Sequence, residues 1–237
     1  MPKYLPKVVS FDCAQTLLEV DWSVSRYIAD LCMHLGLEIP LHGPARYEEI
    51  YHQRLRSYIH VNMTRDHAKC DAWWLELGQD WLIEMELPPD RARDLQLASE
   101  QLGFGPQSIL FRLYEDVVPC LATIKNLGIR TAVLSNWDYS LHKTLRGFGL
   151  SDHFELIVAS LEHGVEKPDP ALFQVLVDHF QVSRDEIMHV GDNPEDDLAG
   201  ARGAGMRGVL LDRSLNRSDE PVLHTLSNLA EAFDWSG

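Results

Sequence analysis

The fold prediction starts from the segment Lys7-Val8-Val9-Ser10-Phe11-Asp12-Cys13-Ala14-Gln15-Thr16-Leu17-Leu18. Its apolar-rich first half predicts a short buried strand, and Asp12 follows where the chain must leave the sheet. A carboxylate at this point is either a turn residue or a candidate nucleophile. Two residues later stands Ala14, whose methyl side chain cannot act as an acid or a base.

Four further strand-like runs occur after Pro119, and each is followed by a helical segment. They span residues 131–134, 156–159, 187–190 and 208–211. Strands that alternate with helices predict βαβ units and a parallel sheet covered on both faces. Together with the strand before Asp12, they predict a doubly wound, Rossmann-like α/β domain with five parallel strands.

A long helical block separates the first strand from the other four. Its hydrophobic spacing predicts helices near residues 27–35, 47–59, 72–83 and 90–102, and Gly36 is a candidate stop signal. We therefore assign residues 1–17 and 113–237 to the core domain and residues 18–112 to an inserted helical domain. A short helix is predicted at about residues 226–233.

The balance of charge limits the possible partners. The 237 residues carry a formal net charge of −15. Nucleic acids and anionic membrane surfaces are bound by clustered Lys and Arg, so neither is an expected partner. A small anionic substrate remains possible if a local metal ion or lysine reverses the field.

The cysteines and the N-terminal segment predict a cytoplasmic protein. The four cysteines, Cys13, Cys32, Cys70 and Cys120, are widely spaced and form no paired ligand motif. This spacing predicts reduced, mostly buried thiols, with Cys13 as a minor candidate for a reactive one. No signal-peptide run and no segment of transmembrane length is present.

Polar residues follow four of the five predicted strands. They are Asp12, Ser135-Asn136, Lys167 and the acidic run Asp192–Asp197. Each has a common structural explanation, as a turn, a helix cap or a solvated surface charge. Their order after successive strand units favours a site, because open α/β sheets bind ligands at the carboxyl ends of their strands.

The motifs FDxxxTL, LSN, KPDP and GDNPEDDLAGARGAG resemble those of the haloacid dehalogenase-like (HAD) hydrolase superfamily. The helical insert resembles the cap of its subfamily I, and the resemblance covers nearly the whole chain. It implies the sheet order 3-2-1-4-5 with the nucleophile strand at the centre. It also implies a Mg²⁺-dependent phosphatase that acts on a small phosphorylated metabolite through an aspartyl intermediate.

Carried over by position, the resemblance implies that Asp12 is the nucleophile and that Lys167 neutralises it. The implied Mg²⁺ ligands are Asp12, the main-chain carbonyl of Ala14, Asp192 and Asp197. The implied phosphate-binding residues are Ser135, Asn136, Thr16 and Lys167, with Thr16 bracing the loop by a hydrogen bond. Asp197 fits the second acidic position better than Asp196.

The sequence departs from the family pattern at Ala14. Phosphatases of the family generally carry there a second aspartate, which protonates the leaving group and later activates water. The next position, usually glycine, is Gln15. General acid–base catalysis contributes about 10²–10⁴-fold, so we expect either a weak phosphatase or a different reaction.

Three alternatives to a full phosphatase follow from Ala14. A dehalogenase also lacks the second aspartate, because halide leaves without a proton. Such an enzyme needs no metal, whereas the Gly191-Asp192 motif keeps the acidic form of metal-dependent members, so we rank dehalogenation second. Phosphonoacetaldehyde hydrolase carries alanine here and uses a cap lysine as a Schiff base, for which Lys69 is the only lysine of the insert. The third alternative is a catalytically reduced binding protein.

The insert is expected to set substrate specificity. Most of its aromatic residues are expected to pack in its core. Arg54, Arg56 and Arg65 are candidate contacts for a substrate anion, although each is by default a surface cation. Hinges near Leu17–Glu19 and Phe111–Asp116 would let the insert close over the site and exclude water.

Overall fold

The computed structural model describes residues 4–215 and 221–234, which form two compact units. The first contains residues 4–19, 113–138, 149–215 and 221–234, and the second contains residues 20–112 and 139–148. The second unit thus includes the helix α6 (Ser140–Gly147), which the sequence-based domain boundaries placed in the core. We call the two units the core unit and the helical unit.

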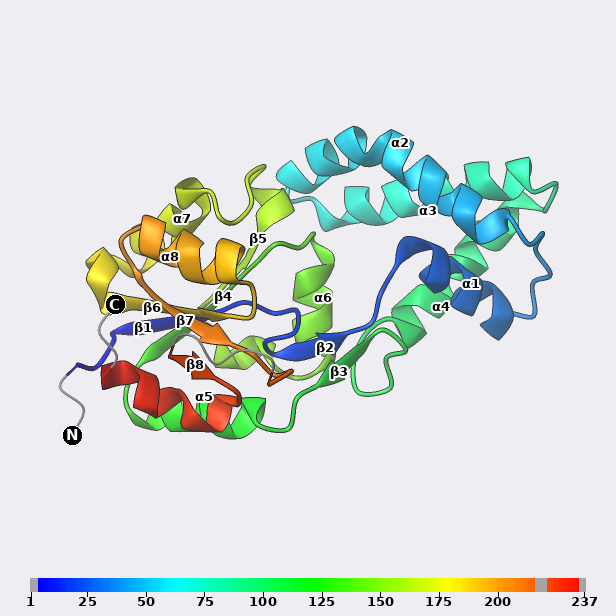
Figure 1. Ribbon diagram of the computed structural model, residues 1–237. Helices are drawn as coiled ribbons and strands as arrows, with labels where there is room; N and C mark the ends of the chain where they lie inside the picture. The colour runs from blue at the N-terminus through cyan, green and yellow to red at the C-terminus, as the bar shows by residue number, and fades with distance from the viewer. Residues whose placement is uncertain (1–3, 216–220, 235–237) are drawn as a thin grey trace. The chain divides into compact units, whose positions relative to one another are not determined.

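The core unit is built on a parallel sheet of six strands in the order β5-β4-β1-β6-β7-β8 (Figure 1). The strands are β1 (Val8–Phe11), β4 (Arg130–Ser135), β5 (Leu156–Ala159), β6 (Ile187–Gly191), β7 (Arg207–Leu211) and β8 (Val222–Leu223). The predicted α/β class is confirmed, and the five predicted strands have the implied order. The predicted number of strands was wrong, because β8 adds a two-residue edge strand too short to produce a sequence pattern.

Helices cover both faces of this sheet, α7 and α8 on one and α5 and η6 on the other (Figure 1). Their bounds are α5 (Val117–Asn126), α7 (Pro170–Phe180), α8 (Gly200–Gly203) and the 3₁₀ helix η6 (Leu226–Asp234). Shorter turns are η2 (Ser151–His153), η3 (Ser160–Glu162), η4 (Arg184–Glu186) and the π-helical η5 (Pro194–Ala199). Phe173 and Leu176 of α7 pack against Val8 and Leu134 in the core beneath.

The helical unit consists of α1 (Val24–His34), α2 (Gly43–Met63), α3 (His67–Glu84), η1 (Pro89–Arg91), α4 (Ala92–Leu102) and α6. Ser23 caps α1 by accepting a hydrogen bond from the Arg26 N–H, and Asp66 caps α3 in the same way. Where the chain passes between the units, β2 (Leu18–Val20) pairs with β3 (Phe111–Leu113).

Polar contacts explain why α6 belongs to the helical unit. The buried Asn62 side chain accepts a hydrogen bond from the Tyr139 N–H at 2.9 Å. Lys143 lies 2.7 Å from Asp71 and 2.5 Å from Glu100. These contacts join residues far apart in the sequence, which local sequence patterns do not predict.

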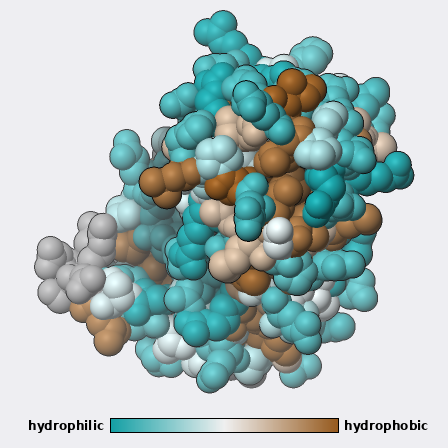
Figure 2. Space-filling model, turned by 90° about the vertical axis from the view of Figure 1, so that its right-hand side faces the viewer, coloured by the Kyte–Doolittle hydropathy of each residue, from teal (hydrophilic) through white to brown (hydrophobic). Residues whose placement is uncertain are grey.

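The surface mixes hydrophilic and apolar areas, as the face in Figure 2 shows. Exposed large apolar side chains of the helical unit include Trp22, Met33, Leu41, Ile83 and Leu97. All four cysteines are free and buried, as predicted. Within the described residues, no helix is both long and apolar enough to cross a membrane.

Candidate functional site

The loop after β1 presents Asp12 at the carboxyl end of the sheet. The Asp12 N–H still donates to the Val190 carbonyl of β6 at 2.8 Å, so this residue is held at the sheet edge. The Cys13 carbonyl accepts hydrogen bonds from Leu17 and Leu18 and closes a tight turn. Gln15 has a φ of 54°, a left-handed conformation that costs a non-glycine residue about 1–2 kcal/mol.

Lys167 reaches Asp12 because its own backbone is fixed. The Asn136 side-chain amide accepts a hydrogen bond from the Lys167 N–H at 2.7 Å and donates to the Lys167 carbonyl at 3.0 Å. This pair ties the loop after β4 to the loop before α7. The side-chain amide of Asn136 therefore positions Lys167, while its predicted contact with phosphate stays a prediction.

The Lys167 ammonium bridges two buried carboxylates. Its Nζ lies 2.7 Å from Asp12 Oδ1 and 2.6 Å from Asp197 Oδ1. Ser135 donates a third hydrogen bond to this group, from its Oγ to Asp12 Oδ1 at 2.9 Å. Burial disfavours the ammonium, but the two carboxylates outweigh it and raise the pKa of Lys167, which keeps its charge.

The Asp197 carboxylate occupies space that is free because residue 191 is a glycine. A Cβ atom at Gly191 would fall 2.1 Å from the Asp197 carboxylate. Burial opposes ionisation of Asp197, yet hydrogen bonds from His189 and Lys167 lower its pKa. Asp196, in contrast, is half-buried and accepts a hydrogen bond from the Asn193 side chain at 3.1 Å.

Three carboxylates converge at this site. One oxygen from each of Asp12, Asp192 and Asp197 lies within 4.8 Å of the others. Burial, and then the charges of Asp12 and Asp197, raise the pKa of Asp192 to about 7. The three carboxylates thus repel one another where water solvates them poorly. Their oxygens form a donor set that suits a hard divalent cation.

The loop after β1 holds two further residues of the predicted site, Thr16 and Ala14. The Thr16 hydroxyl is buried and has no hydrogen-bond partner among the described residues, so the predicted brace through this hydroxyl is not formed. Instead, the Thr16 carbonyl accepts a hydrogen bond from Arg213 at 2.8 Å. Ala14 forms a single bridge with Leu18 beside the turn.

The predicted cations of the helical unit lie near its surface. Lys69 is largely exposed and pairs with Asp66 at 3.1 Å, so it lacks the desolvated surroundings of a Schiff-base lysine. Arg54 pairs with Asp80. Arg56 and Arg65 are exposed.

The sequence analysis did not predict several polar residues of the core unit that make buried contacts. Ser10 and His189, both inside strands, are fully buried and hydrogen-bonded to each other. The available signal was a polar residue within an otherwise apolar strand. Arg213 stands in a polar segment after β7, and no sequence pattern distinguishes it from a surface cation.

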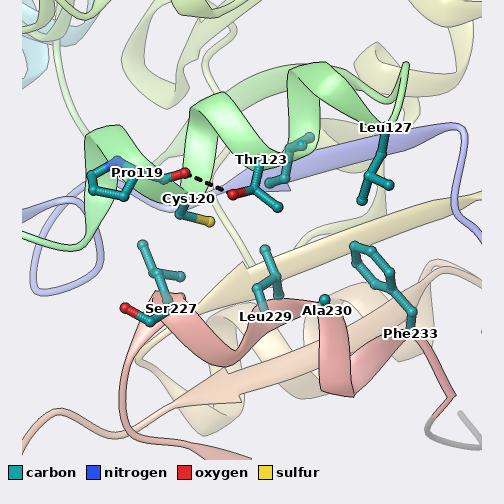
Figure 3. Close-up of a pocket in the computed structure, with 10 residues that line it drawn as sticks. Pro119, Cys120, Thr123, Leu127, Ser227, Leu229, Ala230 and Phe233 are labelled. Carbon is teal, nitrogen blue, oxygen red and sulfur yellow. Dashed lines mark hydrogen bonds between the residues drawn. The ribbon is translucent and has the colours of Figure 1, made fainter.

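A pocket of about 150 Å³ lies between α5 and η6 (Figure 3). Its wall includes Pro119, Cys120, Leu127, Leu229 and Phe233. It shares no residue with the carboxylate cluster and offers mainly apolar side chains. We therefore place the candidate site at Asp12 and its neighbours.

Comparison with known proteins agrees with the family resemblance of the sequence motifs. A family profile described as haloacid dehalogenase-like hydrolase matches residues 6–205. Phosphoserine phosphatase of Thermus thermophilus is 39% identical over 249 aligned residues, covering 96% of this chain and 98% of that protein. Haloacid dehalogenase-like hydrolase domain-containing protein 3 of Danio rerio is 30% identical over 230 residues, covering 94% and 93%.

The fold has a close counterpart among solved structures. The 2-haloacid dehalogenase of Pseudomonas syringae superposes with a TM-score of 0.71 at 23% identity, covering 96% of this chain and 97% of that one. At this identity the likeness establishes the shared fold. Because the family match spans most of the sequence, the chain belongs to the haloacid dehalogenase-like hydrolases and is a hydrolase.

Proposed function

We propose that this hydrolase is a Mg²⁺-dependent phosphatase that acts on a small phosphorylated metabolite through Asp12. The carboxylate cluster carries the proposal. Three carboxylates and the one ammonium of Lys167 leave two negative charges when all are ionised. Such a site repels an anionic substrate unless a cation neutralises it.

The donor set of the cluster fits Mg²⁺. Carboxylate oxygens of Asp12, Asp192 and Asp197 are the hard ligands that this ion prefers, and we infer that the Ala14 carbonyl adds another. When bound, Mg²⁺ would neutralise phosphoryl oxygens and the charge that develops on them. The raised pKa of Asp192 is consistent with a site built to hold a cation.

Asp12 would supply the nucleophilic oxygen. A bond forms between a carboxylate oxygen and phosphorus while the ester P–O bond breaks, and the leaving oxygen keeps the electron pair. Lys167 and Ser135 hold Asp12 Oδ1 and thereby orient the carboxylate for attack. Water then attacks the phosphorus of the aspartyl phosphate, which releases phosphate and restores Asp12.

Ala14 determines which substrates would react well. It provides no proton for the leaving oxygen, so esters whose alcohols are already acidic should react faster than simple alkyl phosphates. The Gln15 side chain accepts a hydrogen bond from the Tyr114 hydroxyl at 3.1 Å. A neutral amide does not titrate, so Gln15 does not replace the missing acid.

The relatives support a phosphatase. Phosphoserine phosphatase, at 39% identity over nearly both full lengths, is named for a small phosphorylated substrate. By the same family resemblance, we propose that the helical unit is the cap that selects the substrate. Neither argument identifies the metabolite, so a substrate screen is the first experiment.

The first test is a panel of phosphate esters with and without Mg²⁺, for the wild type and Asp12→Asn. We expect phosphate release that requires both Mg²⁺ and Asp12. The panel should compare aryl, acyl and alkyl phosphates at matched concentrations. Absence of release from every ester, with Asp12→Asn indistinguishable from the wild type, would instead favour a binding protein.

A second test restores the missing acid with Ala14→Asp and uses Ala14→Asn as a control of similar size. We expect Ala14→Asp to raise the rate on alkyl phosphates by up to about 10²–10⁴-fold, with a smaller gain on aryl phosphates. Ala14→Asn should produce no such selective gain. Equal gains from both variants would show that size at this position, and not proton transfer, limits the rate.

Dehalogenation is the second candidate, and Ala14 is the observation that favours it. Halide leaves without a proton, so such an enzyme needs no acid at this position. Against it stands the acidic cluster, because two carboxylates beside Asp12 would repel a haloacid anion. A halide-release assay on 2-haloacids decides between the two, and release without Mg²⁺ would replace the phosphatase proposal.

A further inference from the structure

Two polar residues face each other inside the central sheet. Ser10 of β1 and His189 of β6 are register partners, and neither is exposed to solvent. Their neighbours on these strands are mainly apolar. Burying a hydroxyl and an imidazole costs free energy unless each finds hydrogen-bond partners, so this pair requires an explanation.

The hydrogen bonds define the state of the imidazole ring. His189 Nε2 lies 3.0 Å from Asp197 Oδ1, and His189 Nδ1 lies 2.8 Å from Ser10 Oγ. An ionised carboxylate only accepts hydrogen bonds, so Nε2 carries the hydrogen. In the neutral ring Nδ1 is then an acceptor, and it is the nearer acceptor for the Ser10 hydroxyl, since the Met188 carbonyl lies 3.5 Å from Ser10 Oγ. Phe173 packs edge-on against the ring, with the centroids 5.4 Å apart.

These contacts fix both oxygens of Asp197. Oδ1 accepts from His189 and from Lys167, and Oδ2 accepts from the Asn193 N–H at 2.9 Å. The missing side chain of Gly191 leaves the space that the carboxylate occupies. A continuous chain of hydrogen bonds therefore runs from Ser10 through His189, Asp197 and Lys167 to Asp12.

We propose that His189, oriented by Ser10, is a positioning residue that holds the Asp197 carboxylate for Mg²⁺ and for Lys167. This inference rests on the proposed function. Without the Nε2–H donor, the carboxylate loses one of its three fixed contacts and turns toward its remaining donors. Hydrogen-bond partners of metal-binding carboxylates typically change metal affinity by about 10–100-fold when removed.

The main test compares Mg²⁺ binding by calorimetry in the wild type, His189→Leu and His189→Gln. Leucine removes the donor, whereas the glutamine amide can still donate to Asp197. We expect His189→Leu to weaken Mg²⁺ binding by about 10–100-fold and His189→Gln to recover most of that loss. Met188→Leu, a buried change of similar volume in the same strand, should bind Mg²⁺ like the wild type.

Kinetics provides a second readout. We expect His189→Leu to lower kcat at saturating Mg²⁺ with little change in KM, because His189 does not contact substrate. A folded His189→Leu protein with wild-type Mg²⁺ affinity and wild-type kcat would overturn the inference. If the wild type itself binds no Mg²⁺, the proposed function fails, which is a distinct result.

A measurement on the wild type covers the case in which His189→Leu does not fold. Imidazole ¹⁵N shifts at neutral pH, assigned through His189→Gln, should show a neutral ring with hydrogen on Nε2. Ser10→Ala should weaken Mg²⁺ binding less than His189→Leu does. A ring with hydrogen on Nδ1 and none on Nε2 would overturn the inference, because Asp197 would then receive no hydrogen bond from it.

Discussion

At the scale of single residues, the site depends on one hydrogen-bond acceptor shared between two donors. Asp12 Oδ1 accepts from both Ser135 and Lys167. Asp12 and Lys167 stand in two separate loops and Ser135 ends β4, and each is held by its own backbone contacts. Their side chains need little reorganisation to meet a substrate, which is the physical basis of preorganised catalysis.

Gly191→Ala tests the space for Asp197. The added methyl group would lie 2.1 Å from the carboxylate, so the Asp197 side chain must move. We expect phosphatase activity to fall by about 10–100-fold or more, because the Asp197 carboxylate is no longer held in place. We also expect the free energy of unfolding to fall by about 1–3 kcal/mol. Gly203→Ala, where nothing lies within 4 Å, is the control and should leave activity unchanged. Wild-type activity in Gly191→Ala would contradict the geometry.

At the scale of elements, Arg213 joins the loop after β1 to α5 and η6. Its guanidinium donates to the Thr16 carbonyl at 2.8 Å and to Asp116 Oδ1 at 2.9 Å. Asp116 also accepts hydrogen bonds from the Thr225 hydroxyl and the Leu226 N–H. The C-terminal helix and the nucleophile loop thus share one ion pair, which is mostly buried.

Asp116→Asn tests this connection through pH. Burial opposes ionisation of Asp116, but its hydrogen bonds outweigh burial and lower its pKa below the ordinary 3.8. The carboxylate therefore stabilises the folded state above about pH 4, and that contribution is lost as pH falls through the depressed pKa. We expect Asp116→Asn to cost about 1.5–3 kcal/mol in urea unfolding at neutral pH.

The difference from the wild type should shrink as unfolding is repeated at progressively lower pH. The exposed Asp178→Asn, on α7, serves as the control and should be nearly neutral. A constant difference across the whole pH range would show that Asp116 acts by packing and not by charge.

Most elements were predictable because their signals are local. The strands before Asp12 and Ser135 are short apolar runs, and the structure has both. The helix after Lys167 begins at Pro170 with Asp169 as its cap, as a local pattern should. The strand β8 was missed, because a two-residue edge strand forms only when a neighbouring strand is present to pair with it.

At the scale of the whole molecule, the net charge of −15 makes cations stabilising in general. A specific Mg²⁺ site should add to this effect. At a Mg²⁺ concentration of a hundred times Kd, the expected gain is about 2.7 kcal/mol. We therefore expect millimolar MgCl₂ to raise the melting temperature more than NaCl of equal ionic strength, and chelation to reverse the gain.

Asp192→Asn provides the matched comparison for this measurement. It removes one carboxylate of the cluster and should abolish the difference between MgCl₂ and NaCl. Equal responses to the two salts in the wild type would indicate only general screening of the negative charge. That result would contradict the proposed metal site.

The thiols offer a test of how well both units are packed. All four cysteines are free and buried, and burial raises the pKa of Cys32 to about 11 and of Cys120 to about 12. We expect the native protein to react very slowly with a thiol reagent, and four thiols to react after unfolding in guanidinium. Rapid labelling of one thiol in the native protein would identify a region that opens locally.

The sequence by itself determined the α/β class and identified Asp12, Lys167, Asp192 and Asp197 as candidates, because strand periodicity and motif spacing are local properties. The order of the strands came from the family resemblance. Only the tertiary structure decided that Asn136 fixes the Lys167 backbone, that the Thr16 hydroxyl has no partner among the described residues, and that Ser10 and His189 support Asp197. Those contacts join residues that parallel strands and their loops bring together from distant parts of the chain. Whether a hydrogen bond forms depends on differences of a few tenths of an ångström in the distance between donor and acceptor. That distance is set by packing and not by spacing along the sequence.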